Sequence, residues 1–236
     1  MELCVLGRCG PFPRAGEACS GYLLCENETH ILLDCGAGVL SRLRAALDLA
    51  ALDAVVLSHL HFDHCGDMAV LRYALEQLPR PPLPVYCPME PAYARAIFDA
   101  PVFELRPISD GRRTDIGAFS LRFHAMTHPV PSFGAMISGG GARLFYTGDT
   151  GWFEGLPALA KGADALLADC CFTDADADRP PIHLSARQAG RLARAAGAGT
   201  LYCTHLYGGA DGDAALQKEV DFSPAVVVQE RGRYII

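Results

Sequence analysis

Short apolar runs of strand length alternate along the chain with segments whose apolar residues recur at helical spacing. In the first half, runs such as LCVLG and HILLDCG are bounded by glycine and proline, as strands usually are. The strands predicted in this half cover residues 3–7, 20–26, 30–36, 54–59 and 85–88. The predicted helices cover residues 38–50, 66–77 and 90–99.

The second half of the chain repeats this mixture. Its predicted elements are strands at 119–128, 163–172 and 200–206, a hairpin over 134–149 that turns at Gly139–Gly141, a helix at 185–197, and a final hairpin over 225–236 that turns at Arg231 and Gly232. Two sheets packed together with helices outside are the natural layering for such a pattern. We therefore predict a single domain over residues 1–236.

The polar stretch HLHFDH follows the apolar run at 54–59 and concentrates ligand-type side chains. His59 and His61 are two positions apart, so an extended segment presents both imidazoles on one side, toward a common ion. Asp63 and His64 follow where the chain turns into a helix, and they can face a second ion. Imidazoles and carboxylates at this density are typical of a zinc-like metal site.

Two ions in one site need further ligands from elsewhere in the chain. His128 in MTHPVP, Asp149 in FYTGD and His205 in CTHLY each lie within a few residues of the end of a strand-like run. Sheet architectures gather such side chains around a cleft. We therefore expect these three residues to complete the site.

In this order, the HLHFDH stretch, His128, the Gly148-Asp149 step and the Thr204-His205 step resemble the metallo-β-lactamase superfamily. The resemblance implies an α/β fold, a four-layer αββα sandwich with a dinuclear metal site. It implies one metal on His59, His61 and His128, a second on Asp63, His64 and His205, Asp149 as the bridge, and Asp34 as a supporting residue. Two Zn²⁺ ions are expected, although Mn²⁺ or iron also fits these ligands.

The carboxylate at Asp149 separates branches of that superfamily. Zinc β-lactamases resemble the chain less, because a cysteine typically holds their second metal there, and diiron redox members usually have glutamate in place of His61. The stretches IHLSARQAG and THPVPSFG resemble the ribonuclease Z branch, particularly its shorter bacterial members. By that resemblance His183 is the general acid. The alternative is that His183 only supports the start of the helix at Ser185.

Charge and composition narrow the classes of molecule that the protein is expected to bind. The net charge of −7 opposes non-specific binding to polyanions, so no extended nucleic-acid surface is expected. No apolar run reaches the length of a membrane span, and the start lacks the order of a secretory signal, so we expect a cytoplasmic protein without membrane contact. The ten cysteines show no CxxC spacing and are interpreted mostly as reduced, buried residues.

These observations favour a dinuclear metal-dependent phosphodiesterase. A water bridging two ions has its pKa lowered to roughly 7 and is expected to attack a small phosphodiester, such as a cyclic nucleotide or short RNA. Asp63 would orient that water or accept its proton, and His183 would protonate the leaving oxygen. The alternatives are a tRNA 3′-end endonuclease, a thioesterase of the glyoxalase II type, and a non-catalytic metal-binding module. The stretch 79–127 is too short for a separate tRNA-binding arm, and relatives in this branch suggest a homodimer.

Overall fold

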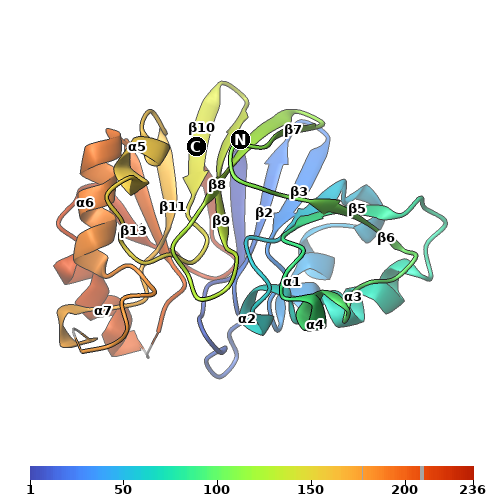
Figure 1. The fold of residues 1–236 in the computed structure, drawn as a ribbon, viewed down its shortest axis with the longest axis horizontal. Helices are drawn as coiled ribbons and strands as arrows, with labels where there is room; N and C mark the ends of the chain where they lie inside the picture. The colour runs from blue at the N-terminus through green and yellow to red at the C-terminus, as the bar shows by residue number, and fades with distance from the viewer. Residues whose placement is uncertain (177, 208–209) are drawn as a thin grey trace.

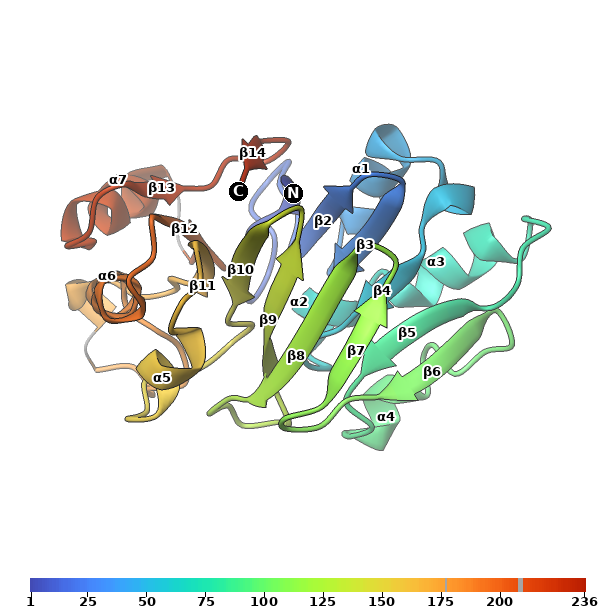
Figure 2. The ribbon, with the colours of Figure 1, turned by 90° about the horizontal axis from the view of Figure 1, so that it is seen from above.

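The computed structural model describes residues 1–176, 178–207 and 210–236, and its strands form two seven-stranded sheets (Figures 1 and 2). The first sheet has the order β14 (Arg233–Ile235), β1 (Glu2–Gly7), β2 (Gly21–Glu26), β3 (Thr29–Leu33), β4 (Ala54–Val56), β5 (Leu83–Cys87) and β6 (Phe103–Pro107). The second has the order β13 (Ala225–Val227), β12 (Thr200–Thr204), β11 (Ala165–Asp169), β10 (Ala142–Tyr146), β9 (Phe133–Gly139), β8 (Phe119–Ala125) and β7 (Arg113–Ile116).

Each sheet is antiparallel at one end and parallel at the other. Strands β14, β1, β2 and β3 pair antiparallel, whereas β3 to β6 pair parallel. In the second sheet β7 to β10 pair antiparallel and β10 to β13 pair parallel. Parallel neighbours need crossover connections, and these connections carry the helices.

The helices lie on the two outer sides of the pair of sheets (Figures 1 and 2). On the first sheet they are α1 (Val39–Ala46), α2 (Phe62–Cys65), α3 (Met68–Leu75) and α4 (Ala92–Arg95), with a 3-10 turn, η1 (Leu49–Ala51). On the second they are α5 (Leu156–Ala160), α6 (Ala186–Ala196) and α7 (Ala210–Glu219), with a second turn, η2 (Asp174–Asp176). In the described part of the chain, none of these helices combines the length and apolar character needed to cross a membrane.

Three apolar clusters separate four layers. One lies between the first sheet and its helices, one between the two sheets, and one between the second sheet and its helices. Strand β2 shows the cause, because successive side chains of a strand point to opposite faces. Leu23 packs in the cluster under the helices, whereas Tyr22 and Leu24 pack between the sheets. The predicted αββα sandwich is therefore confirmed.

The predicted C-terminal hairpin is wrong. The chain does turn at Arg231, whose φ is 61°, and Gly232 donates to the Gln229 carbonyl at 2.9 Å. The flanking strands nevertheless join different sheets, because β13 pairs with β12 and β14 pairs with β1. Residues around a turn carry a local signal, whereas pairing is decided by which sheet edge lies within reach. The C-terminal segment thus connects the two sheets.

Other predicted elements are present with shorter bounds. The hairpin over 134–149 forms as β9 and β10, and Gly140 and Gly141 at its tip have φ of 58° and 80°. The strand expected at 54–59 ends at Val56, and the helix expected at 90–99 is reduced to α4. No prediction was made for β6, β7, α5 or α7.

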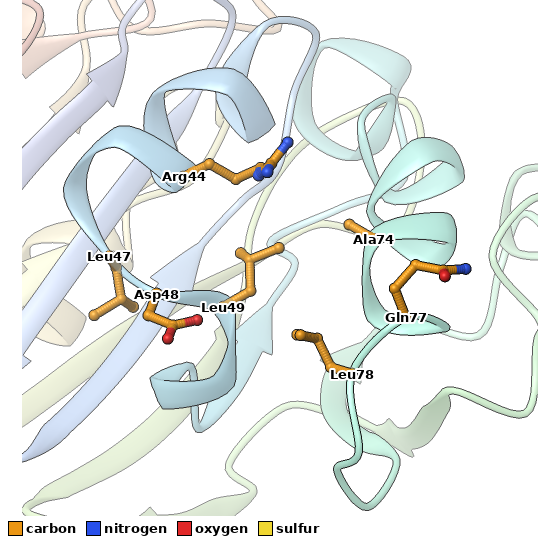
Figure 3. A pocket seen from close by; sticks show the side chains of 7 residues that line it. All are labelled: Arg44, Leu47, Asp48, Leu49, Ala74, Gln77 and Leu78. Carbon is orange, nitrogen blue, oxygen red and sulfur yellow. The ribbon is translucent and has the colours of Figure 1, made fainter.

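A groove of about 500 Å³ lies among α1, η1 and α3, on the helix side of the first sheet. Figure 3 shows Leu47, Leu49 and Leu78 lining it together with Arg44 and Gln77. Its lining contains none of the histidines predicted to bind metal. The predicted metal ligands lie away from this groove, after the ends of strands from both sheets.

Candidate metal centre

The predicted ligands reach one place because they follow strands of both sheets. A short segment after β4 leads through His59 to His61, which is the N-cap of α2, and Asp63 and His64 lie in that helix. From the second sheet, His128, Asp149 and His205 follow β8, β10 and β12. His205 has a φ of 56°, a left-handed backbone conformation that turns the chain sharply at the end of β12.

His59, His61 and His128 form the first group of candidate ligands. The Nδ1 atom of His61 lies 3.0 Å from Nε2 of His59 and 3.1 Å from Nε2 of His128. Burial lowers the pKa of all three imidazoles, and that of His59 falls well below its usual value. The three rings are therefore neutral at pH 7, which is the form that binds metal.

Asp63, His64, Asp149 and His205 form the second group. The Nε2 atom of His205 lies 3.2 Å from Oδ2 of Asp63 and 3.2 Å from Oδ2 of Asp149. The other oxygen of Asp149, Oδ1, lies 3.2 Å from Nε2 of His64. Asp149 also faces the first group, since its Oδ2 lies 3.7 Å from Nε2 of His59. This carboxylate therefore stands between the two groups, as a bridging ligand requires.

The chemistry of these residues fits a pair of bound cations. Within the described residues, Nε2 of His64 and Oδ1 of Asp149 are buried and lie 3.2 Å apart, but they are not aligned for a hydrogen bond with each other or with another group. Buried polar atoms nearly always have partners, so these two atoms indicate a missing one. Burial alone would lower the pKa of His64, but Asp149, Asp63 and Asp34 outweigh it and raise that pKa to about 10. The carboxylates around His64 therefore supply negative charge that bound cations would neutralise.

Asp34 is hydrogen-bonded to the candidate ligand His64, as the resemblance implies for a supporting residue. Its carboxylate accepts hydrogen bonds from Nδ1 of His64 at 2.8 Å, from the Ser58 backbone N–H at 2.7 Å and from the Ser58 hydroxyl at 2.8 Å. The Tyr146 hydroxyl donates to the same carboxylate. These bonds fix the ring of His64 with Nε2 directed toward Asp149. The contribution of Tyr146 was not predicted.

Two further ring orientations are fixed in the same way. Nδ1 of His59 lies 3.0 Å from the Ser58 hydroxyl, and Nδ1 of His128 lies 3.1 Å from the Ile182 carbonyl. When a histidine donates through one nitrogen, the other is left free to bind a metal. Both rings therefore direct Nε2 into the first group.

Replacing Asp34 by asparagine is expected to weaken metal affinity by about 10- to 100-fold. The amide keeps the size of the side chain but loses the charge that orients His64. Competition against a metal-binding dye measures this change. Asp115→Asn, an exposed position on β7, is the matched control and should leave affinity unchanged. Equal affinity in D34N and the native protein would contradict the supporting role.

His183 lies beside the two groups and is held by Asp169. Its Nδ1 is 2.9 Å from Oδ2 of Asp169 and 3.8 Å from Oδ2 of Asp149, and its ring stacks on that of His205 with centroids 4.8 Å apart. Burial would lower the pKa of His183, but Asp169 outweighs it and raises that pKa. Asp169 therefore holds the His183 ring in place and favours its protonated form.

The alternative role of His183 at the start of a helix is not what the structure shows. The capping box of α6 is made by Ser185 and Gln188, which bond each other's backbone N–H groups. Asp169, at the end of β11, accepts from His183 and also from the backbone N–H of Cys171 at 3.2 Å. Cys171 itself stays a thiol, because burial raises its pKa to about 11.

Comparison with known proteins agrees with this geometry. Residues 29–206 match the family described as the β-lactamase superfamily domain. The probable metallo-hydrolase YhfI of Bacillus subtilis (strain 168) is 33% identical over 223 residues, which cover 87% of this chain and 87% of that protein. A ribonuclease Z of Mycobacterium avium (strain 104) is 32% identical over 239 residues, with 87% and 85% covered.

Solved structures show the same similarity. The crystal structure of YhfI matches with a TM-score of 0.89 at 31% identity and covers 99% of both chains. Human tRNase Z, short form, matches with a TM-score of 0.80 at 20% identity, over 100% of this chain and 99% of that one, which shows a shared fold. The family match and the relatives extend over most of the chain. The protein therefore belongs to the β-lactamase superfamily and is a metal-dependent hydrolase with relatives of the ribonuclease Z type.

Proposed function

We propose that the protein is a dinuclear metal-dependent phosphodiesterase that acts on a small phosphodiester. The observation that carries this proposal is the pair formed by His183 and Asp169 beside the two ligand groups. Alkoxides are poor leaving groups, so their release from phosphorus profits from a proton donor. The carboxylate of Asp169 beside Nδ1 raises the pKa of His183 and so favours the protonated ring that can be this donor.

Each residue of the site has a distinct task in this mechanism. One cation would be held by His59, His61 and His128. The other would be held by Asp63, His64 and His205. Asp149 would contribute to both. When bound, two cations supply positive charge to the phosphoryl oxygens and lower the pKa of a water. Burial would raise the pKa of Asp63, but His64 and His205 outweigh it and lower that pKa, so its carboxylate is ionised and can orient the attacking water.

His183 would protonate the leaving oxygen. Because Nδ1 donates to Asp169, the proton on Nε2 faces away from that carboxylate and is available for the substrate. A proton donor of this kind contributes about 10²- to 10⁴-fold in rate. Asp169 keeps the ring charged before transfer and in the correct orientation.

A small substrate is favoured by the course of the chain between the two sheets. In the described residues, the segment between Cys87 and Arg113 folds as α4 and β6 against the first sheet instead of projecting as an arm. The second candidate function is tRNA 3′-end cleavage, which is favoured by the identity of 32% with a protein named ribonuclease Z.

The proposal is tested by two parallel assays, one with bis-(p-nitrophenyl) phosphate and one with a thioester as substrate. The phosphodiester should be cleaved by protein loaded with Zn²⁺ or Mn²⁺, and a chelator should abolish that cleavage. Cleavage of the thioester alone would overturn the proposal and favour the thioesterase alternative. Binding of both metals without cleavage of either compound would favour a metal-binding module. A precursor tRNA in the same assay tests the second candidate.

Two expectations from the resemblance extend this proposal. Zinc is proposed as the metal of the purified enzyme, and elemental analysis of protein grown without added metal checks it. A homodimer is proposed as the assembly, and size-exclusion chromatography with light scattering measures its mass.

A further inference from the structure

A small pocket opens next to His183, and none of the predicted metal ligands lines it. Its volume is about 190 Å³, and it is lined by Phe172, Thr173, Arg179, Pro181, Ser185 and Gln188 together with His183, Asp174 and Asp176. His183 is the residue that faces the leaving oxygen in the proposed reaction. A group bonded to that oxygen would therefore lie next to this pocket, because His183 is part of its lining.

Flat groups surround the pocket. The Phe172 ring meets the ring of His183 edge to face, with centroids 5.4 Å apart and an interplanar angle of 88°. The guanidinium of Arg179 lies 5.7 Å from the centre of the Phe172 ring and 4.4 Å from the centre of the Tyr207 ring. Planar rings and guanidinium groups offer faces on which another planar group can stack.

The charges of the pocket suit a substrate that is itself an anion. Asp176 is ion-paired with Arg179 at 2.8 Å, and Asp174 is ion-paired with Arg187. Both carboxylates are therefore neutralised by neighbouring arginines, which reduces repulsion of a phosphodiester. Asp176 also fixes Arg179, so the guanidinium is held over the Phe172 ring before a substrate arrives.

We propose that Phe172 and Arg179 determine specificity by stacking on a planar ring in the leaving alcohol of the substrate, so that the preferred leaving group is a nucleoside. This proposal rests on the phosphodiesterase function proposed above. It adds that the enzyme recognises the leaving alcohol of the substrate and that Phe172 and Arg179 make this contact.

Two phosphodiesters that differ only in the leaving alcohol test it. Uridylyl-(3′→5′)-adenosine releases adenosine, and the methyl ester of uridine 3′-phosphate releases methanol, so both leave as alkoxides and only the first carries a ring. With the metal-loaded native protein, kcat/KM should be higher for the dinucleotide, with the products separated by liquid chromatography. In Phe172→Leu the ratio of kcat/KM for the dinucleotide to kcat/KM for the methyl ester should fall about tenfold, because base stacking on an aromatic ring is worth that much or more. The change should appear as a higher KM for the dinucleotide.

The matched control is Tyr93→Leu, which removes an exposed ring on α4. It should leave both substrates unaffected. Arg179→Gln should lower the preference in the same direction as Phe172→Leu. Adenosine binding, measured by equilibrium dialysis, should weaken about tenfold in Phe172→Leu and stay unchanged in Tyr93→Leu.

The outcomes separate this inference from the function on which it rests. An equal loss for both substrates in Phe172→Leu would mean that the ring only positions His183, and the stacking proposal would be wrong. Native kinetics and native adenosine binding in that variant would also overturn it, while phosphodiester cleavage stands. Failure of the metal-loaded native protein to cleave either phosphodiester would overturn both.

Discussion

Asp149→Asn is expected to abolish nearly all hydrolysis, with a loss of roughly 10³-fold or more in kcat. The amide keeps the shape of the side chain but removes the negative charge that both ligand groups share. Two-metal sites contribute several kcal/mol of charge stabilisation to the transition state, which corresponds to a rate effect of this order. The measurement is kcat on bis-(p-nitrophenyl) phosphate together with the metal content per chain.

Asp149 is expected to matter this much because its carboxylate reaches residues of both ligand groups. One of its oxygens lies 3.2 Å from Nε2 of His64, and the other lies 3.2 Å from Nε2 of His205 and 3.7 Å from Nε2 of His59. Metal content in D149N should therefore fall below two ions per chain. Asp115→Asn serves again as the control, with unchanged activity and metal content. A D149N protein that keeps both ions and native turnover would exclude the bridging role.

His183→Ala should lower kcat by about 10²- to 10⁴-fold on substrates with alkoxide leaving groups. The loss should be much smaller on bis-(p-nitrophenyl) phosphate, because p-nitrophenolate leaves without a proton. Metal content should remain native, since His183 belongs to neither of the two ligand groups of the proposal. Loss of metal in this variant would mean that His183 is a ligand and that its assignment as the acid is wrong.

The dependence of rate on pH gives His183 a second, independent test. Asp169 raises the pKa of His183 above its ordinary value, so the imidazolium persists to higher pH than in a free histidine and is lost as the pH rises through that raised pKa. The rate on an alkoxide substrate should therefore fall on the alkaline side. In Asp169→Asn the attraction is removed, so the fall should begin at lower pH. An unshifted alkaline limb in D169N would contradict the positioning role of Asp169.

The sequence was sufficient to predict which seven polar residues come together, because its signals are local. HLHFDH places four ligand-type residues in one turn of chain, and His128, Asp149 and His205 each follow a recognisable strand. The structure brings all seven residues together. Their roles as ligands stay predictions until metal is measured. The layered fold followed from the alternation of short strands and helices, which the three apolar clusters confirm.

Contacts between distant parts of the chain could not be predicted in this way. Tyr146 reaches Asp34 across 112 positions, and the Ile182 carbonyl reaches His128 across 54. Neither contact has a sequence pattern of its own, because each depends on how the two sheets face each other. The same reason explains the wrong C-terminal hairpin. Its turn residues were read correctly, but the strands on either side found partners in different sheets.

Asp34 and His205 both have left-handed backbones, with φ of 57° and 56°. A side chain in this conformation costs roughly 1–3 kcal/mol, a penalty that glycine escapes. Glycine would relieve that backbone cost at either position, but at Asp34 it would also leave the hydrogen-bond donors of Ser58, His64 and Tyr146 without their acceptor. Mutations that raise the melting temperature are therefore best sought away from these two turns.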